Sequence, residues 1–122
     1  MHLPKLLPYF LPVLLFCYGP IQGQSNLIRA EKQKLSSVKD SISCINSINR
    51  LGMLYHMRNL DSALYYGIKA KEMATRLQYP KGAADADNVI ATIFAMRGMY
   101  QESLQLLTHA LSAYSIQKDS AN

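Results

Sequence analysis

The chain is 122 residues long, contains no tryptophan and three phenylalanines, and carries a formal net charge of +5. This length allows one domain at most, and a composition rich in Ala, Leu and Tyr suits thin helical layers better than the thick core of a sheet. The positive side chains are scattered, and their densest cluster, residues 29–39, includes Glu31. A nucleic-acid interface would gather Lys and Arg on one face, so we expect no nucleic-acid partner.

Residues 1–23 are typical of a secretory signal peptide. A short start that carries Lys5 precedes an apolar run over residues 6–19. The run is too short and too interrupted by proline to span a bilayer, which takes about 20 helical residues. A small and polar stretch, residues 20–24, follows. This order predicts cleavage after Gly23 and an exported protein, periplasmic or extracytoplasmic, with no membrane span in the chain.

The cysteines are interpreted in the light of export. Cys17 would leave with the signal peptide, so Cys44 would have no partner for an internal disulfide. A lipoprotein signal that uses Cys17 is the alternative, but it needs a small residue before the cysteine, and Phe16 is bulky. Cys44 lies beside the apolar strip of its helix, which predicts a small apolar filler and no reactive thiol.

Residues 24–40 are predicted to form a short N-terminal helix and a linker. Ser25 and Asn26 can cap a helix over residues 27–35, which is mostly polar.

The helix predicted next covers residues 41–57, with Asp40 as its N-cap. Its apolar residues recur at steps of three and four, which predicts one buried stripe. The stripe consists of Ile42, Ile45, Ile48, Leu51 and Tyr55. Gly52 lies inside this helix at a cost of about 1 kcal/mol relative to Ala. We therefore expect another helix to cross close to Gly52.

Three further helices are predicted, over residues 61–78, 82–97 and 100–116. Asp61 is expected to cap the first of them. Large apolar side chains that are expected to point inward are Leu64, Ile68, Met73 and Leu77, then Ile90, Ile93 and Phe94, and finally Leu104, Leu107, Leu111 and Tyr114. No segment alternates with a period of two, so no sheet is expected.

The stretch over residues 51–74 recurs over residues 90–113. Pairs that lie 40 residues apart are Ala63 and Ser103, Leu64 and Leu104, and Ala70 and Ala110; Gly52 and Ala91, and Tyr55 and Phe94, lie 39 apart. A fixed period whose change is confined to a turn marks stacked supersecondary units. The predicted fold is therefore all-α, an α-solenoid of antiparallel helix pairs.

This pattern resembles the tetratricopeptide repeat (TPR), whose first helix carries a large residue, Leu-Gly and Tyr, and whose second carries Ala-Leu and a later Ala. The first copy, residues 41–79, supplies Ile48, Leu51, Gly52, Tyr55, Leu60, Ala63, Leu64 and Ala70; the second, residues 82–117, supplies Ile90, Ala91, Phe94, Gly98, Tyr100, Leu104, Leu107, Ala110 and Leu111. The departures are Ala91, Ser103, and Asp87 in place of a large apolar residue. The resemblance implies two TPR units plus a short N-terminal helix after a signal peptide, and a polar tail over residues 118–122.

The sequence of residues 61–86 is similar to that of the exported repeat arrays that precede sensor histidine kinases and helix-turn-helix regulators in Bacteroidetes-type bacteria. Those proteins continue into a transmembrane helix and a signalling domain. The resemblance implies that this chain is the N-terminal part of such a protein or a stand-alone relic of one. The apolar face of the last helix agrees with a fragment or with a chain that pairs with a partner, because solenoids normally need about three repeats.

The TPR resemblance also implies a groove, lined by the first helix of each pair, that binds a protein or peptide partner. Carried onto this chain, the groove residues are Asn46, Asn49, Met53, His56 and Met57, and then Asp85, Asn88, Thr92, Ala95 and Met96. Asparagines can bond an extended peptide backbone through both donor and acceptor, and methionines adapt to varied apolar side chains. The alternative is an ordinary solvated helix face. Asn49 and Met53 replace the Lys and Asn of the family's clamp for chaperone carboxylates, so that ligand is not predicted.

A soft metal site is the other chemistry to consider. Met53, His56 and Met57 lie on one helix face and could hold Cu(I), although methionines at helical spacing more often serve packing. No zinc spacing, phosphate loop or nucleophile motif occurs. His109 is expected at an exposed position, and Asp85 and Asp87 face different sides of a helix. We therefore predict no metal, no cofactor and no enzyme activity.

Three hypotheses follow from the sequence. The first is an exported module that binds a protein or peptide, at the input end of a signalling protein. The second is a structural spacer or self-association element that uses the uncovered last helix. The third is an exported ligand- or metal-binding protein, supported only by the methionine and histidine set.

Overall fold

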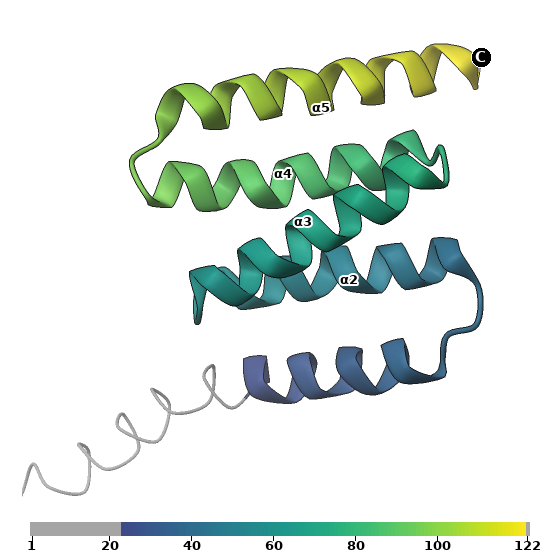
Figure 1. Ribbon diagram of the computed structural model, residues 1–122, viewed down its shortest axis with the longest axis vertical. Helices are drawn as coiled ribbons and strands as arrows, with labels where there is room; N and C mark the ends of the chain where they lie inside the picture. Colours follow the sequence, from purple (N-terminus) through teal and green to yellow (C-terminus); the bar gives the residue numbers. More distant parts are fainter. Residues whose placement is uncertain (1–22, 122) are drawn as a thin grey trace, which may run out of the picture.

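The computed structural model describes residues 23–121, which are helical apart from short turns and contain no strand. Residues 23–37 form a first helix. The others are α2 (Ser41–Tyr55), α3 (Leu60–Arg76), α4 (Pro80–Met96) and α5 (Tyr100–Ser120). Figure 1 shows the helices stacked in chain order, with α3 crossing in front of α2 and α4. The predicted all-α solenoid of helix pairs is confirmed.

The centre of the stack is α4. It contacts α2, α3 and α5, whereas α2 and α5 do not touch each other. The two first helices of the pairs, α2 and α4, therefore lie against each other, and each second helix packs against the first helix of its own pair. Among the described residues, no helix combines the length and the apolar character needed to cross a membrane. The predicted signal peptide lies outside the described residues apart from Gly23.

Several predicted helix ends are shifted. The first helix covers residues 23–37 rather than 27–35, and the hydroxyls of Ser36 and Ser37 bond to carbonyls three residues earlier in it. The helix α2 ends at Tyr55 rather than at residue 57. The helix α5 runs on to Ser120, so most of the segment predicted as a polar tail is helical.

The N-caps were predicted correctly at one helix and wrongly at another. Asp40 caps α2 by accepting a bond from the Ser43 amide, as expected. At α3 the cap is Asn59, whose side chain accepts from the Ser62 amide, and Asp61 lies in the first turn. The helix α4 begins at Pro80, two residues before the predicted start, because proline suits the first helical position, where an amide would be unsatisfied.

Small residues allow the helices to approach closely. The contact face of α3 buries Ala63, Gly67, Ala70 and Ala74, while α2 buries the large side chains Ile45, Ile48 and Leu51. A Cβ added at Gly52 would lie 2.8 Å from Cγ1 of Val89 in α4, which confirms the close helix crossing predicted there. Cys44 packs against this core as a free cysteine, within the described chain.

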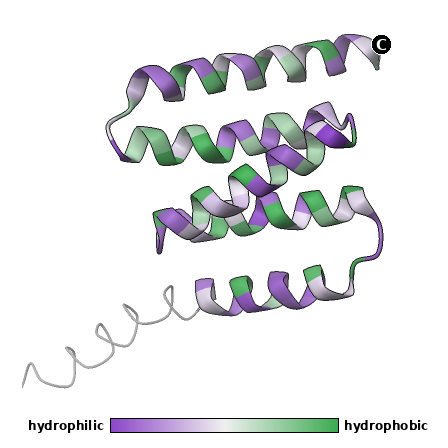
Figure 2. Ribbon diagram, viewed as in Figure 1, coloured by the Kyte–Doolittle hydropathy of each residue, from purple (hydrophilic) through white to green (hydrophobic). Residues whose placement is uncertain are grey.

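Some apolar residues predicted to be buried are exposed instead. Ile42, Ile68 and Leu77 are each about half exposed. The reason at α3 is that its small residues form the buried face, so the bulky Ile68 lies outside it. In α5, Leu104, Leu107 and Leu111 are exposed as well, and only Ser103 and Ala110 are buried. Figure 2 shows hydrophobic and hydrophilic residues alternating along α5.

Candidate functional site

The surface between α2 and α4 contains a small hollow of about 230 Å³. It is lined by Asn46, Asn49, Arg50, Met53, Asp85, Asn88 and Val89. The contact between α2 and α4 thus brings together half of the residues predicted for the groove. The other predicted groove residues, His56, Met57, Thr92, Ala95 and Met96, do not line the hollow, and His56 and Met57 follow the end of α2. Sequence reasoning missed Arg50 and Val89.

Asn49 has a structural role as well as a place in the hollow. Its side chain is only 6% exposed, and its amide nitrogen donates to the carbonyl of Gly82 over 3.0 Å. This bond ties α2 to the first turn of α4. Its carbonyl oxygen Oδ1 has no hydrogen-bond partner among residues 23–121. That oxygen is itself buried, so neither polar group of the Asn49 side chain is open to a ligand.

Other polar groups of the hollow are already engaged. Asp85 accepts from Lys81 Nζ at 2.8 Å and from the Tyr114 hydroxyl at 2.5 Å. The bond to Asp85 raises the pKa of Lys81. The pKa of Tyr114 is raised above its usual range, first by burial and then by the bond to Asp85. Asn46 accepts from the Tyr79 hydroxyl over 3.2 Å.

Asn88 is an accessible polar residue of the hollow whose side chain is not engaged. Its side chain is exposed and has no hydrogen-bond partner in the described part of the chain. Its backbone carbonyl accepts a bond from the Thr92 hydroxyl at 2.9 Å. Both the donor and the acceptor of the Asn88 side chain are therefore available to a bound backbone.

The methionines of the predicted groove are exposed rather than packed. Met53, Met57 and Met96 each expose a large part of the side chain, so the packing interpretation of Met53 and Met57 is wrong. His56 Nδ1 contacts the backbone carbonyl of Met53 one turn earlier. Three flexible apolar side chains, one in α2, one just after α2 and one in α4, are thus exposed.

A buried carboxylate network lies behind this face and was not predicted. Asp87 in α4 is fully buried. Its Oδ1 lies 2.6 Å from Lys71 Nζ of α3, and its Oδ2 lies 2.6 Å from Nδ1 of His109 in α5. His109 is exposed, as predicted, yet it reaches this carboxylate. The one sequence signal was an aspartate at a position where the first repeat has Ile48.

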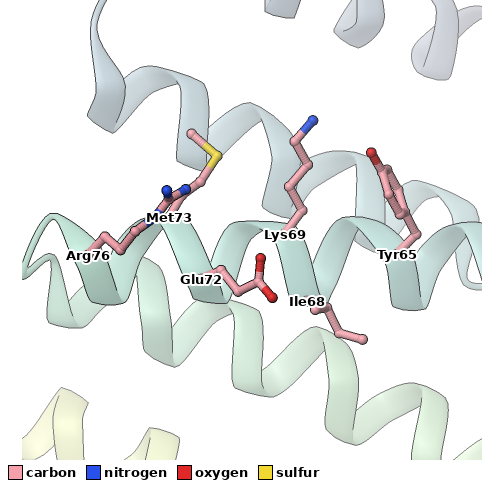
Figure 3. Close-up of a pocket in the computed structure, with 6 residues that line it drawn as sticks. All are labelled: Tyr65, Ile68, Lys69, Glu72, Met73 and Arg76. Carbon is pink, nitrogen blue, oxygen red and sulfur yellow. The ribbon is translucent and has the colours of Figure 1, made fainter.

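Two larger hollows lie along α3. One of about 440 Å³ is lined by Tyr65, Ile68, Lys69, Glu72, Met73 and Arg76, and a neighbour of about 540 Å³ shares Ile68, Glu72 and Arg76. Figure 3 shows that the six labelled residues all come from α3, with Lys69 and Tyr65 pointing the same way and Ile68 pointing away from them. Lys69 Nζ lies 5.7 Å from the centre of the Tyr65 ring. All the residues that line these two hollows belong to α3.

The stacked helix pairs, the glycine at the α2 crossing and the caps define a TPR protein. A comparison with family models matches residues 21–118 to the SusR N-terminal TPR domain, and the chain belongs to this family. The matched range includes the first helix as well as both pairs. Searches of curated proteins and of solved structures found no match. TPR domains generally mediate interactions between proteins.

Proposed function

We propose that this chain is an exported module that binds an extended segment of a protein partner in the groove between α2 and α4. The module would form the N-terminal part of a bacterial signalling or sensor protein, and it would act by binding rather than by catalysis. Support for export comes from residues 1–23, and support for the signalling context comes from the resemblance of residues 61–86 to exported sensor arrays.

The observation that carries the proposal is the unused side chain of Asn88 in the hollow. Asn88 is exposed and offers both a free donor and a free acceptor. An extended backbone presents an amide and a carbonyl at regular intervals, and the Asn88 side chain can bond to both. The exposed side chains of Met53, Met57 and Met96 would contact apolar residues of the same segment.

Immobilised peptides of random sequence test the groove against the full chain. We expect a subset of peptides to bind and Asn88→Ala to weaken that binding about three- to tenfold, as for the loss of one or two hydrogen bonds. Asn88 is the better target because Asn49→Ala would also break the tie to Gly82. Gln105→Ala, an exposed amide on α5, is the matched control and should leave binding unchanged. Equal peptide binding by the original protein, the Asn88→Ala variant and the Gln105→Ala variant would overturn the groove assignment.

Export and the signalling context have tests of their own. Expression of the full chain followed by fractionation should place it in the periplasm, and mass spectrometry should find residues 1–23 removed. An unprocessed protein retained in the cytoplasm would overturn the export proposal. The intact mass of the protein isolated from its own source should exceed that of 122 residues if a signalling domain follows.

The alternative function is a structural spacer or self-association element. The observation that favours it is the exposed apolar side of α5, which includes Leu104 and Leu111. Light scattering after size exclusion separates the two functions. A monomer that binds peptides supports the groove, and a stable dimer that binds none supports self-association.

A further inference from the structure

One face of α5 is apolar and uncovered in the described chain. Tyr100 is 70% exposed, Leu104 and Leu111 are each 66% exposed, and Leu107 lies between them on the same side of the helix. A hollow of about 300 Å³ runs along this face and is lined by Asn88, Leu107, Ala110, Leu111 and Tyr114. None of these lining residues is charged. A contiguous apolar face of this kind marks an interaction surface for an apolar partner.

The chain itself contains the same surface in its occupied form, one repeat earlier. The period relates Leu104 to Leu64, Leu107 to Gly67, Leu111 to Lys71 and Asn88 to Asn49. Each of these earlier residues is at the junction with α4. Leu64 packs on the cluster that includes Val89 and Ile93, Gly67 lies against Val89 and Ile90, Lys71 pairs with Asp87, and Asn49 bonds the carbonyl of Gly82. The helix interface that seats α4 thus continues onto the face of α4 and α5.

We infer that the face of α4 and α5 binds an amphipathic helix of a partner protein, seated as α4 is seated on α2 and α3. The Asn88 amide would donate to a carbonyl in the first turn of that helix, as Asn49 donates to Gly82. The apolar face of α5, which carries Tyr100, Leu104, Leu107 and Leu111, would cover the apolar side of the partner helix. This site shares only Asn88 with the hollow of the proposed groove, and it differs from the groove in ligand because it takes a helix rather than an extended segment.

The residues that differ between the two surfaces define the partner's sequence pattern. In α4, Asp87 lies five residues after the bonded carbonyl of Gly82 and pairs with Lys71. Leu111 takes the place of Lys71 on the second surface, so the partner helix should have a large apolar residue at the position that corresponds to Asp87. Val89, seven residues after Gly82 in α4, lies against Gly67. Leu107 takes the place of Gly67 on the second surface, so the partner helix should have a small residue at the position that corresponds to Val89. The partner helix therefore carries a large apolar residue and then a small one two positions later.

This pattern argues against a second copy of the chain as the occupant. In α4 the two positions hold Asp87 and Val89, a buried charge and a branched side chain, which is the opposite arrangement. In α2 they hold Ile48 and Arg50, and the arginine is far too large for the second position. Neither first helix of the described chain fits opposite Leu107 and Leu111.

Two labelled helical peptides test the inference on the full chain by fluorescence anisotropy. One has the sequence of residues 80–98, and the other has the same sequence with Asp87→Leu and Val89→Ala. We expect the altered peptide to bind at least about tenfold more tightly, because it places no charge on Leu111 and no branched side chain on Leu107. Equal binding of the two peptides, or binding of neither, would overturn the inference.

Exchange of the surface residues supplies the reciprocal test. Leu107→Ala with Leu111→Lys makes the protein resemble its own first repeat, so the preference should shift toward the unaltered peptide. Both side chains are exposed, and a circular dichroism melt should show that the variant stays folded. Met53→Ala, in the groove of α2 and α4, should leave both peptide affinities unchanged.

The same variants separate this site from the proposed groove. Leu111→Lys should abolish binding of the altered helical peptide and spare any random-sequence peptide captured by the groove. If light scattering shows a dimer that Leu111→Lys dissolves, a second copy occupies the face and the inference is wrong. If no random-sequence peptide binds the groove while the altered helical peptide still binds, the proposed function is wrong and the helix site stands.

Discussion

The two helix pairs share one backbone plan but are held together differently. In the first pair, α2 contributes Ile45, Ile48 and Leu51, and α3 meets them with a face of small residues. In the second pair, α5 buries only Ser103 and Ala110. Directional polar contacts replace the missing apolar area there. The Ser103 hydroxyl donates to the Ala91 carbonyl at 2.8 Å, His109 contacts Asp87, and Tyr114 contacts Asp85.

The helix caps follow the same division. Side chains of Asp40 and Asn59 cap the two helices of the first pair. The residues at the starts of α4 and α5, Tyr79 and Met99, make no side-chain cap bond. The comparison teaches that a repeat protein can keep its geometry while its second unit exchanges burial for hydrogen bonds and ion pairs. It also leaves the large side chains of α5 free to face outward.

The largest predicted effect is at the apolar core of the first pair. Ile48→Ala removes a side chain that is buried in the α2–α3–α4 core. We expect a loss of about 2–5 kcal/mol in the free energy of unfolding, from lost burial and the remaining cavity. Urea unfolding followed by circular dichroism measures it. Ile42→Ala, at an exposed position of the same helix, is the control and should change stability by no more than about 0.5 kcal/mol.

The equivalent position in the second pair should respond differently. Asp87→Ala should cost about 1–3 kcal/mol, because Lys71 and His109 lose a buried acceptor but can return to water. Asp87→Leu restores the type of residue that Ile48 supplies in the first pair. We expect it to recover most of that loss or to exceed the original stability, since apolar replacement of buried ion pairs is often neutral or stabilising.

The same urea titration decides this comparison. If Asp87→Leu is as destabilising as Asp87→Ala, the carboxylate is needed for the packing of α5. In that case the polar contacts of Asp87 would stabilise the second pair in a way that a buried apolar side chain cannot replace.

A smaller effect is expected at the bond between α5 and α4. Tyr114→Phe removes the hydroxyl that donates to Asp85 and should cost about 0.5–1.5 kcal/mol near pH 7. The pKa of Tyr114 is raised in the folded state, so its contribution is complete below the unfolded value of about 10 and is lost as the pH rises through the folded value. The difference between the original and variant proteins should therefore narrow above about pH 10. Urea midpoints measured on both proteins from neutral to alkaline pH test this, and a constant difference would contradict it.

The smallest effect concerns the cap of α2. Bonds from Ser43 lower the pKa of Asp40, so its stabilising contribution is present above the unfolded value and is lost as the pH falls through the folded value. An NMR titration of the Asp40 carboxyl should show the lowered pKa. Asp40→Asn keeps an acceptor for the Ser43 amide but does not titrate, so its stability should depend less on acid pH. Equal acid dependence in both proteins would remove this role from Asp40.

The sequence by itself determined the kind of fold. Apolar residues at steps of three and four predicted helices, and a period of about 40 residues predicted stacked pairs, because such patterns depend only on local geometry and on the need to bury one helix face. The cap at Asp40 and the close crossing at Gly52 were also predicted, since both depend on a few neighbouring residues or on one absent side chain. Residues predicted on α2 and α4, including Asn49 and Asn88, were indeed brought to one hollow by the contact of those helices.

Only the tertiary structure decided which polar groups are used and which remain free. Asn49 bonds Gly82, Asp87 bonds His109, and Tyr114 bonds Asp85, and in each case the partners are more than 20 residues apart. A helical pattern gives the direction of a side chain but not its neighbours on another helix. Those neighbours depend on how closely and at what angle the helices cross, which is set by the small residues of α3 and by the whole stack at once.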